Sequence, residues 1–392
     1  MLKKSFLICA LASSMFIGGI SSAMAEMSEQ ELRLTALEEK QQANDQLLEI
    51  LKRFTWHGDL RTRYQWEATQ GSAAGAHKLD RDRIRLRFRI GATVHMSKNL
   101  DIGFRLDTPG VGTIDSGNAT LDGGFGSKGI DLGRAYFNYR PNIMGLETSV
   151  WGGKFAPNFM RSEIVWDSDV NPEGFAESFS KKLGDTKVEA NFGQFLLDEN
   201  NPGKEIWLMG YQGVLSQKTG IGKFKFAVAY YDVVNSEGTT SAPTGSSGIL
   251  NTASEVEMLD IMAEWSEKIM GQKLKIFGEY EQNVGKLAAG VSDLDTAWQI
   301  GAKYGKSGEK FGDYDLKVIY RVVQSSAVLD SISDSDFHGG NSNGRGFEAG
   351  GSIGLRKGVK LALTYFDTRD ERAIGDSPQE NQTFQADLKF KF

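Results

Sequence analysis

The sequence predicts an all-β fold, a transmembrane antiparallel β-barrel of about 16 strands preceded by a short N-terminal coiled-coil helix. Three observations support this prediction: a secretory leader, polar and apolar residues that alternate with period 2 from Phe54 onward, and connections that are alternately short and long. The mean hydropathy of -0.35 argues against a helical membrane protein. It does not argue against a barrel, because barrel strands turn every second residue toward water.

The overall composition is that of a folded protein and excludes several classes. The chain has 392 residues, with 46 Gly, 7 Pro and a single Cys, which argues against disorder and against a disulfide scaffold. Lys and Arg number 45 against 51 Asp and Glu, for a net charge of -6. A general nucleic-acid-binding protein needs a basic surface, so this class is disfavoured.

Residues 1–25 are predicted to be a signal peptide. Lys3 and Lys4 precede an apolar stretch from Phe6 to Ile20, and small residues follow, ending in Ala23-Met24-Ala25. We expect cleavage before Glu26. The alternative is an uncleaved anchor, but the apolar run is shorter than the roughly 20 residues that a membrane-spanning helix needs. The protein is therefore expected to be exported, and its mature form to be either soluble or a barrel.

Residues 26–53 are predicted to form a periplasmic coiled-coil helix, because Met27–Leu51 contains no Gly or Pro and many good helix formers. Two seam positions of a heptad repeat are occupied by Met27, Leu34, Gln41 and Leu48, and by Gln30, Leu37, Asn44 and Leu51. Polar residues in such a seam fix register and oligomer number. The alternatives are a helix that packs on the protein's own body and a short parallel coiled coil that ties subunits together.

Residues 54–392 are predicted to form the transmembrane barrel domain. The clearest strand places apolar Ile84, Leu86, Phe88 and Ile90 on one face, and on the other face four arginines, Arg83, Arg85, Arg87 and Arg89. In a soluble sandwich the charged face would meet bulk water, whereas in a barrel it would line a channel and the apolar face would meet lipid. The lengths of the connections favour the barrel.

Fifteen alternating runs are evident after Phe54, and the connections indicate a sixteenth. Tight turns such as Ser97-Lys98 alternate with long polar loops at 234–254, 325–343 and 370–380. With fifteen strands the loop 234–254 would fall on the periplasmic side, where connections are short. One more strand is needed before residue 187, and Gly174–Leu183 is the candidate, although its periodicity is the poorest. Sixteen is an even number, as single-chain bacterial barrels require.

Several short motifs in sequence order carry a family resemblance. They are the segment from Phe54 to Tyr64, Trp151–Phe155, Trp166–Asp169, Pro172–Gly174, and an alternating last strand that ends on the aromatic Phe392. Over the whole mature chain the sequence resembles the bacterial outer-membrane putative porin family and, more distantly, the phosphate-selective porins. The resemblance implies a sixteen-stranded, trimeric porin. It does not imply a particular solute, because members of the family differ in this respect.

Seven arginines on the first three predicted strands are candidate pore-lining residues. A guanidinium group presents a fixed fork of donors that suits passing carboxylates and phosphates. The alternative is that these arginines only brace the wall by pairing with Asp59, Glu67, Asp101 and Asp107. The candidates are Arg61, Arg63, Arg83, Arg85, Arg87, Arg89 and Arg105.

The loop at 156–173 is the candidate constriction loop and carries Glu163, Asp167, Asp169 and Glu173. It is the third outer loop by the strand count, and the resemblance to trimeric porins implies that this loop folds into the bore. Its acids would then face the arginines and set up a transverse field across a narrow eyelet. The alternatives are a solvated outer loop and a Ca²⁺ site, although the spacing is not that of an EF-hand.

We interpret the protein as an outer-membrane porin, a water-filled channel for passive diffusion of small hydrophilic solutes and ions with an anion preference. The net charge and the acidic loop oppose that preference. The expected partners are outer-membrane lipid, further copies in a homotrimer, and the solutes; no nucleic acid, cofactor or metal is expected. The alternatives are a barrel anchor or adhesin-type surface protein and a barrel sheath for an electron-transfer partner.

An enzyme is not expected, because a porin selects solutes by bore, charge and loop geometry and makes or breaks no bond. The four histidines are scattered along the chain at His57, His77, His95 and His338. The sequence also lacks the His-Glu-x-x-His and Gly-x-Ser-x-Gly patterns that would indicate a metalloprotease or a serine hydrolase.

Overall fold

The computed structural model describes residues 29–70, 79–108, 114, 116–199, 203–235, 255–287, 293–372 and 378–392. The predicted signal peptide, residues 1–25, and His77 lie outside these ranges. The chain divides into two compact units, Met1–Phe54 and Thr55–Phe392, and each is described by itself.

The first unit contains one helix, α2 (Glu29–Leu51). Its leucines are about half exposed in the single chain. Among the described residues, no helix is both long and apolar enough to cross a membrane. The association of this helix into a coiled coil stays a prediction.

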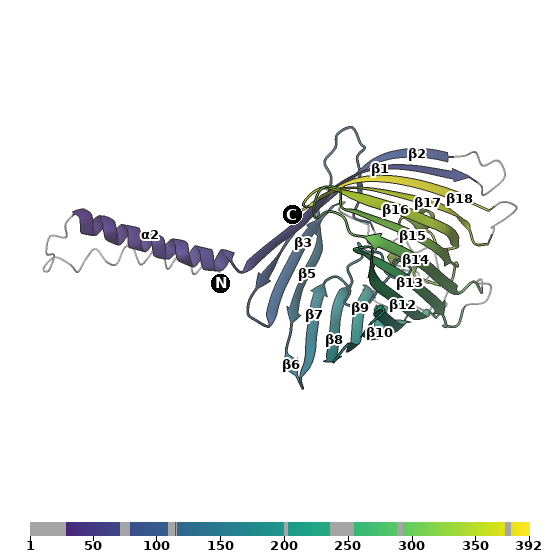
Figure 1. The fold of residues 1–392 in the computed structure, drawn as a ribbon, viewed down its shortest axis with the longest axis horizontal. Helices are drawn as coiled ribbons and strands as arrows, with labels where there is room; N and C mark the ends of the chain where they lie inside the picture. Colours follow the sequence, from purple (N-terminus) through teal and green to yellow (C-terminus); the bar gives the residue numbers. More distant parts are fainter. Residues whose placement is uncertain are drawn as a thin grey trace. The chain divides into compact units, whose positions relative to one another are not determined.

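The second unit is a closed antiparallel β-barrel of sixteen long strands (Figure 1). Consecutive long strands pair with each other, and β1 also pairs with β18, which closes the sheet. Two short strands, β4 (Ala119–Thr120) and β6 (Asn142–Ile143), add to this set. The long strands are β1 (Phe54–Gln70), β2 (Leu79–His95), β3 (Leu100–Asp107), β5 (Asp131–Tyr139), β7 (Leu146–Lys154), β8 (Glu173–Leu183), β9 (Thr186–Asp198), β10 (Ile206–Thr219), β11 (Gly222–Val234), β12 (Glu257–Ile269), β13 (Gln272–Asn283), β14 (Thr296–Gly305), β15 (Tyr314–Val323), β16 (Gly344–Arg356), β17 (Val359–Asp370) and β18 (Glu380–Lys391).

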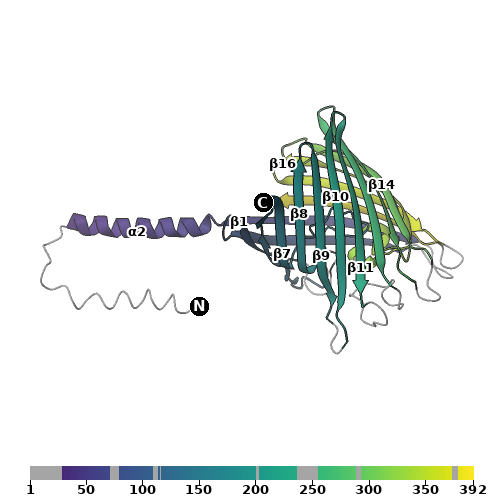
Figure 2. The ribbon, with the colours of Figure 1, turned by 90° about the horizontal axis from the view of Figure 1, so that it is seen from below.

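The predicted fold class and the strand count are confirmed. The candidate sixteenth strand, Gly174–Leu183, is β8 (Glu173–Leu183), which pairs with β7 on one side and β9 on the other. It turns into β9 through Gly184, whose φ of +62° lies in the left-handed region that glycine adopts at little cost. Long strands run side by side around the wall in Figure 2, and β10 and β11 are joined by a tight turn.

The two faces of the wall have the polarity expected of a membrane barrel. Aromatic and aliphatic side chains such as Tyr211, Phe226 and Ile300 are exposed on the outer face. The inner face holds polar residues that are largely buried, such as Gln212, Gln299 and Gln385. This arrangement places apolar groups toward lipid and hydrogen-bonding groups toward the interior.

Two outer loops enter the barrel and pack there. We call residues 155–172 loop L3 and residues 324–343 loop L7. An apolar cluster holds Phe155 and Trp166 of L3 and Leu329 of L7 together with inward-facing Phe195 of β9 and Tyr231 of β11. Edge-on ring contacts join Trp166 to Phe195 at 5.8 Å and to Tyr231 at 5.9 Å between ring centroids. Burial of this much aromatic surface fixes both loops against the inner wall.

Candidate functional site

The candidate site is the place where L3 crosses from one side of the inner wall to the other. One end of L3 is held at β10, where the Gln212 side chain accepts a hydrogen bond from the Met160 amide at 2.7 Å and donates one to the Met160 carbonyl at 2.7 Å. The other end reaches β2, where Asp169 contacts two arginines. L3 therefore spans the interior between two separate parts of the wall.

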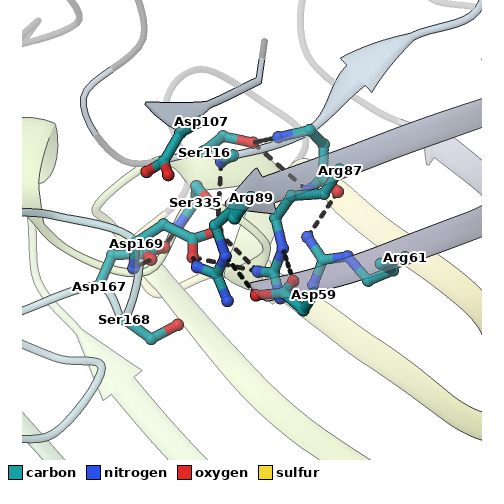
Figure 3. Close-up of polar contacts among 12 residues, drawn as sticks. Asp59, Arg61, Arg87, Arg89, Asp107, Ser116, Asp167, Ser168, Asp169 and Ser335 are labelled. Atoms are coloured by element: carbon teal, nitrogen blue, oxygen red, sulfur yellow. Dashed lines mark hydrogen bonds and ion pairs between the residues drawn. The ribbon is translucent and has the colours of Figure 1, made fainter. Parts of the chain in front are cut away.

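Two arginines and two aspartates form a compact ion-pair group at the β2 end of L3 (Figure 3). The guanidinium of Arg87 lies 2.9 Å from Asp59 and 3.1 Å from Asp169, and that of Arg89 lies 2.6 Å from Asp59 and 2.9 Å from Asp169. Charge-assisted hydrogen bonds of this kind are stronger than neutral ones. The group ties L3 to the wall through Asp169.

The pKa of Asp169 shows the balance of forces in this group. Burial alone would raise the pKa, but the positive charges of Arg87 and Arg89, with that of Arg61 and the Gly117 amide, hold it well below its usual range. The carboxylate stays ionised, so the ion pairs with β2 persist over the neutral pH range.

L7 is tied to the same wall through a buried arginine of β1. Arg63 donates to Asp387 of β18 at 2.7 Å and to Asp336 of L7 at 3.0 Å. Burial would raise the pKa of Asp336, but Arg63, followed by Arg61, lowers it. A second tie joins Asp334 of L7 to Arg321, an inward residue of β15 that is almost completely buried.

L3 and L7 also bind each other inside the barrel. The Asp167 amide donates to the Ile332 carbonyl at 2.7 Å, and the Asp334 amide donates to the Glu163 carbonyl at 3.0 Å. The Ser335 amide donates to the Asp167 carboxylate at 3.0 Å. The two loops are therefore joined to each other inside the barrel and form one connected element, whereas a role of this element as the constriction of a pore stays a prediction.

Two acids of L3 are perturbed by this packing. Burial, followed by the nearby charges of Glu163 and Asp334, raises the pKa of Asp167 to about 9. Burial, followed by the charge of Asp334, raises the pKa of Glu163 to about 7. The loop acids thus divide into Asp169, which stays ionised, and Asp167, which is mainly protonated at neutral pH.

The other predicted arginines lie on the same wall but have different partners. Arg83 pairs with Glu67, and Arg105 pairs with Asp107. Arg61 instead donates to the Asn118 side chain, and Arg85 donates to Gln65 at 3.2 Å and to Ser116 and the Asn118 carbonyl, each at 3.3 Å. Glu173 stands apart from this group. It begins β8, is well exposed and pairs with Lys154 at 2.6 Å.

Several residues that join the loops to the inner wall were not predicted from the sequence. The sequence predicts a polar outer loop at 325–343, yet L7 supplies Asp334 and Asp336 and the apolar residues Leu329, Ile332 and Phe337. These apolar residues were the available signal for an inward fold, because apolar side chains are unfavourable in a loop that stays in solvent. Arg134 of β5 was also missed; it donates to Asn171 of L3 at 2.7 Å.

Metal binding finds no support in the part of the chain that the structure describes. There, no group of three or more His, Cys, Asp or Glu side chains is arranged to hold a metal ion. Asp167 and Asp169, which the calcium alternative invoked, are instead occupied by backbone amides and by arginines.

The comparisons with known proteins agree with this architecture. Of the solved structures, OprB of Pseudomonas putida superposes with a TM-score of 0.56 at 11% identity, over 88% of this chain and 96% of that one. OmpF of Salmonella typhi, in complex with daunomycin, gives a TM-score of 0.50 at 11% identity, over 86% and 97%. At this identity the likeness shows the fold alone. No curated protein matches.

A family model gives the stronger result. The model described as putative porin matches residues 75–269 and 253–392, which together cover most of the chain. The family that the motifs suggested is therefore confirmed, and the barrel belongs to an outer-membrane channel fold. This chain is a member of the putative porin family.

Proposed function

We propose that the protein admits small hydrophilic solutes and ions through the bacterial outer membrane by passive diffusion, with a preference for anions, and that it does so as a homotrimer. One observation carries the anion preference. Three inward arginines of the wall, Arg61, Arg85 and Arg134, have hydrogen-bond partners that are amides, hydroxyls or a carbonyl rather than carboxylates.

The charge that these three arginines bring is not neutralised by a direct ion pair among the described residues. Three other arginines of the wall do pair with carboxylates. Arg87 and Arg89 share two aspartates, and Arg63 binds two others. A constriction with surplus positive charge favours anions over cations. The overall charge of -6 should affect ion selectivity less than the arginines of the inner wall do, because distant exposed charges are screened by salt.

The trimer is supported by the helix of the first unit. Leu34, Leu37, Leu48 and Leu51 occupy the predicted seam, and each is more than half exposed in the single chain. Association of three such helices would bury them, with Gln41 and Asn44 setting the register.

Planar-bilayer recording tests the proposal. We expect purified, folded protein to open in steps of three under a KCl gradient, with a zero-current potential whose sign reports anion preference. The Arg61→Gln variant should reduce that potential, whereas Lys128→Gln, a loop residue paired with Asp122, should not. A cation-selective potential would overturn the anion preference.

The tied L3 and L7 loops favour one second candidate, a barrel that is closed and serves as an anchor for surface loops. The apolar cluster between these loops and the wall is the specific observation behind it. Silence from a verified folded barrel in the same recordings would support the anchor over the channel.

A further inference from the structure

Three lysines stand side by side on neighbouring strands of the inner wall. In the strand register, Lys275 of β13 lies directly opposite Lys303 of β14, and Lys303 lies directly opposite Lys317 of β15. Residues paired in this way share a face, and like charges directly opposite each other are destabilising. This row therefore costs stability unless something compensates it.

Only part of the row is compensated by the protein. The Lys275 ammonium lies 2.9 Å from Glu264, and Lys317 pairs with Glu348. Lys303, in the middle of the row, has no carboxylate within ion-pair distance among the described residues. Its ammonium lies over the ring of Phe277, 5.6 Å from the centroid, with that of Lys275 at 5.3 Å from the same centroid.

A cavity of about 240 Å³ opens between this wall and L3, and it has both a cationic and an apolar side. Lys303 lines it from β14, and Arg161 lines it from L3. The guanidinium nitrogen Nη1 of Arg161 is buried and has no hydrogen-bond partner among the residues that the structure describes. Met160, Phe277 and Ile319 supply its apolar surface.

The shape of the cavity depends on Gly301, which lies directly opposite Phe277 in the register. A Cβ atom there would come within 2.6 Å of the Phe277 ring and 3.0 Å of the Ile319 side chain. The ring therefore lies over the glycine, which leaves the apolar side of the cavity open to a ligand.

The carboxylates at the cavity already have partners or lose their charge. Glu264 is bound to Lys275, and Glu279 accepts a hydrogen bond from Gln299 at 2.6 Å. Glu163 is buried beside Asp334, and its pKa is raised to about 7. Lys303 and Arg161 are left as the groups that a ligand can neutralise.

We propose that this cavity is a binding subsite for a small organic anion that joins one carboxylate to an apolar body. The carboxylate binds between the Lys303 ammonium and the Arg161 guanidinium, and the apolar body packs on Met160, Phe277 and Ile319. A charge-assisted hydrogen bond to the buried guanidinium nitrogen of Arg161 is favourable, because the ligand's carboxylate supplies an acceptor for a donor that otherwise lacks one. The subsite rests on the proposed channel function, which it deepens by naming a solute class.

Isothermal titration of the folded protein in detergent tests the subsite directly, with benzoate as the probe. We expect saturable binding of benzoate with a Kd on the order of 1 mM. Benzamide, which has the same shape without the charge, should not bind. Lys303→Met should weaken benzoate binding at least about tenfold, since it removes the central uncompensated cation.

The matched control is Lys360→Met. Lys360 is a lysine of β17 that hydrogen-bonds to Ser307 at 3.4 Å and does not line the cavity. This variant should bind benzoate as the unaltered protein does. Arg161→Gln, in a loop rather than the wall, repeats the test if Lys303→Met does not assemble.

Conductance measured on the same samples separates the subsite from the channel function. Saturable benzoate binding by a folded barrel that carries no current would support the subsite and overturn the proposed channel function. A conducting protein that shows no saturable benzoate binding would overturn the subsite alone. Equal loss of binding in Lys303→Met and Lys360→Met would also overturn it.

Discussion

The carboxylate of Asp169, at the end of L3, lies 3.1 Å from the guanidinium of Arg87 on β2. This contact ties L3, a loop that enters the barrel, to the arginines of β2 on the inner wall. The same carboxylate also binds Arg89 and accepts the Gly117 amide at 3.2 Å. Asp169 therefore sets both the position of L3 and the charge of the wall beside it.

Asp169→Asn removes one negative charge from the ion-pair group and keeps the size of the side chain. We expect the ratio of chloride to potassium permeability to rise, by about twofold or more, because Arg87 and Arg89 lose a shared counter-charge. The zero-current potential under a KCl gradient measures this ratio.

Glu173→Gln is the matched control, because Glu173 is an exposed acid that pairs with Lys154 away from the arginines. It should change the ratio little. Equal shifts in the two variants would mean that any acid at the outer mouth acts in the same way, and that the contact of Asp169 with β2 is not special.

Arg63→Met should be strongly destabilising. The substitution leaves Asp387, which is 2% exposed, without its main partner, and also unties Asp336 of L7. Removing one member of a buried ion pair costs about 3–5 kcal/mol of the free energy of unfolding. Urea titration of the barrel, followed by tryptophan emission, measures the loss.

An exposed pair provides the comparison for Arg63. Lys128→Met breaks the contact with the well-exposed Asp122 and should leave the urea midpoint nearly unchanged, since exposed pairs add little. A midpoint for Arg63→Met that matches the control would show that Asp387 finds other partners, such as Lys389 at 3.1 Å.

The barrel itself could be predicted from the sequence because its signal is local. From Arg83 to Ile90 in β2, arginines alternate with apolar residues, and this period alone fixes which face each side chain takes. The sixteenth strand, β8, was found by the alternation of short and long connections rather than by its own pattern. The number of strands and the face that each side chain takes can therefore be predicted from short stretches of the sequence.

The contacts of L3 and L7 with the wall could be predicted only in part, because they join distant segments of the chain. Arg87 and Asp169 are 82 residues apart, and Arg63 and Asp336 are 273 apart. The sequence indicated that Arg87 and Asp169 belong to an inner wall and an inner loop. Nothing in the local pattern of L7 indicated that it would fold inward, apart from apolar residues such as Leu329 in a polar stretch. The partner of each arginine likewise depends on the register of separate strands.

Glu281→Gln should make the barrel more stable. Glu281 of β13 is fully buried, and Asp260 of β12 lies directly opposite. Within the described part of the chain, neither carboxylate oxygen of Glu281 has a hydrogen-bond partner. Glutamine cannot ionise, so the substitution removes the cost of holding two facing acids together away from water, and the free energy of unfolding should rise by about 1 kcal/mol. Urea titration measures the change.

Glu380→Gln, at an exposed position at the start of β18, is the control for this substitution and should have little effect. A decrease in stability for Glu281→Gln would contradict the argument, because it would mean that the buried carboxylate is a net stabilising group.

Asn44→Leu tests the predicted coiled coil of the first unit. A buried Asn at a seam position selects one register and oligomer number at a cost in stability. We expect the unaltered protein, as the proposed trimer, to give one species in sedimentation velocity, and the variant to give two or more oligomeric species. Gln42→Leu, outside the seam, should keep the single species. A uniform trimer for Asn44→Leu would mean that the barrel alone sets the oligomer number.

The contact between L3 and L7 should weaken as the pH rises. Burial raises the pKa of Asp167 to about 9 and that of Glu163 to about 7, both above the values these groups have in an unfolded chain. A group of this kind stabilises the folded contact fully below its unfolded pKa, near 4, and that contribution is lost as the pH rises through the folded value. The loss should therefore extend from about pH 4 to about pH 9 and end with two buried negative charges beside Asp334.

Amide hydrogen exchange at Ser335, which donates to Asp167, should accelerate between pH 6 and pH 9 by more than the intrinsic rate does. In Asp167→Asn the excess acceleration should be mostly absent, because the asparagine oxygen accepts the same amide without titrating. Equal acceleration in both proteins would show that the contact does not depend on the protonation of Asp167.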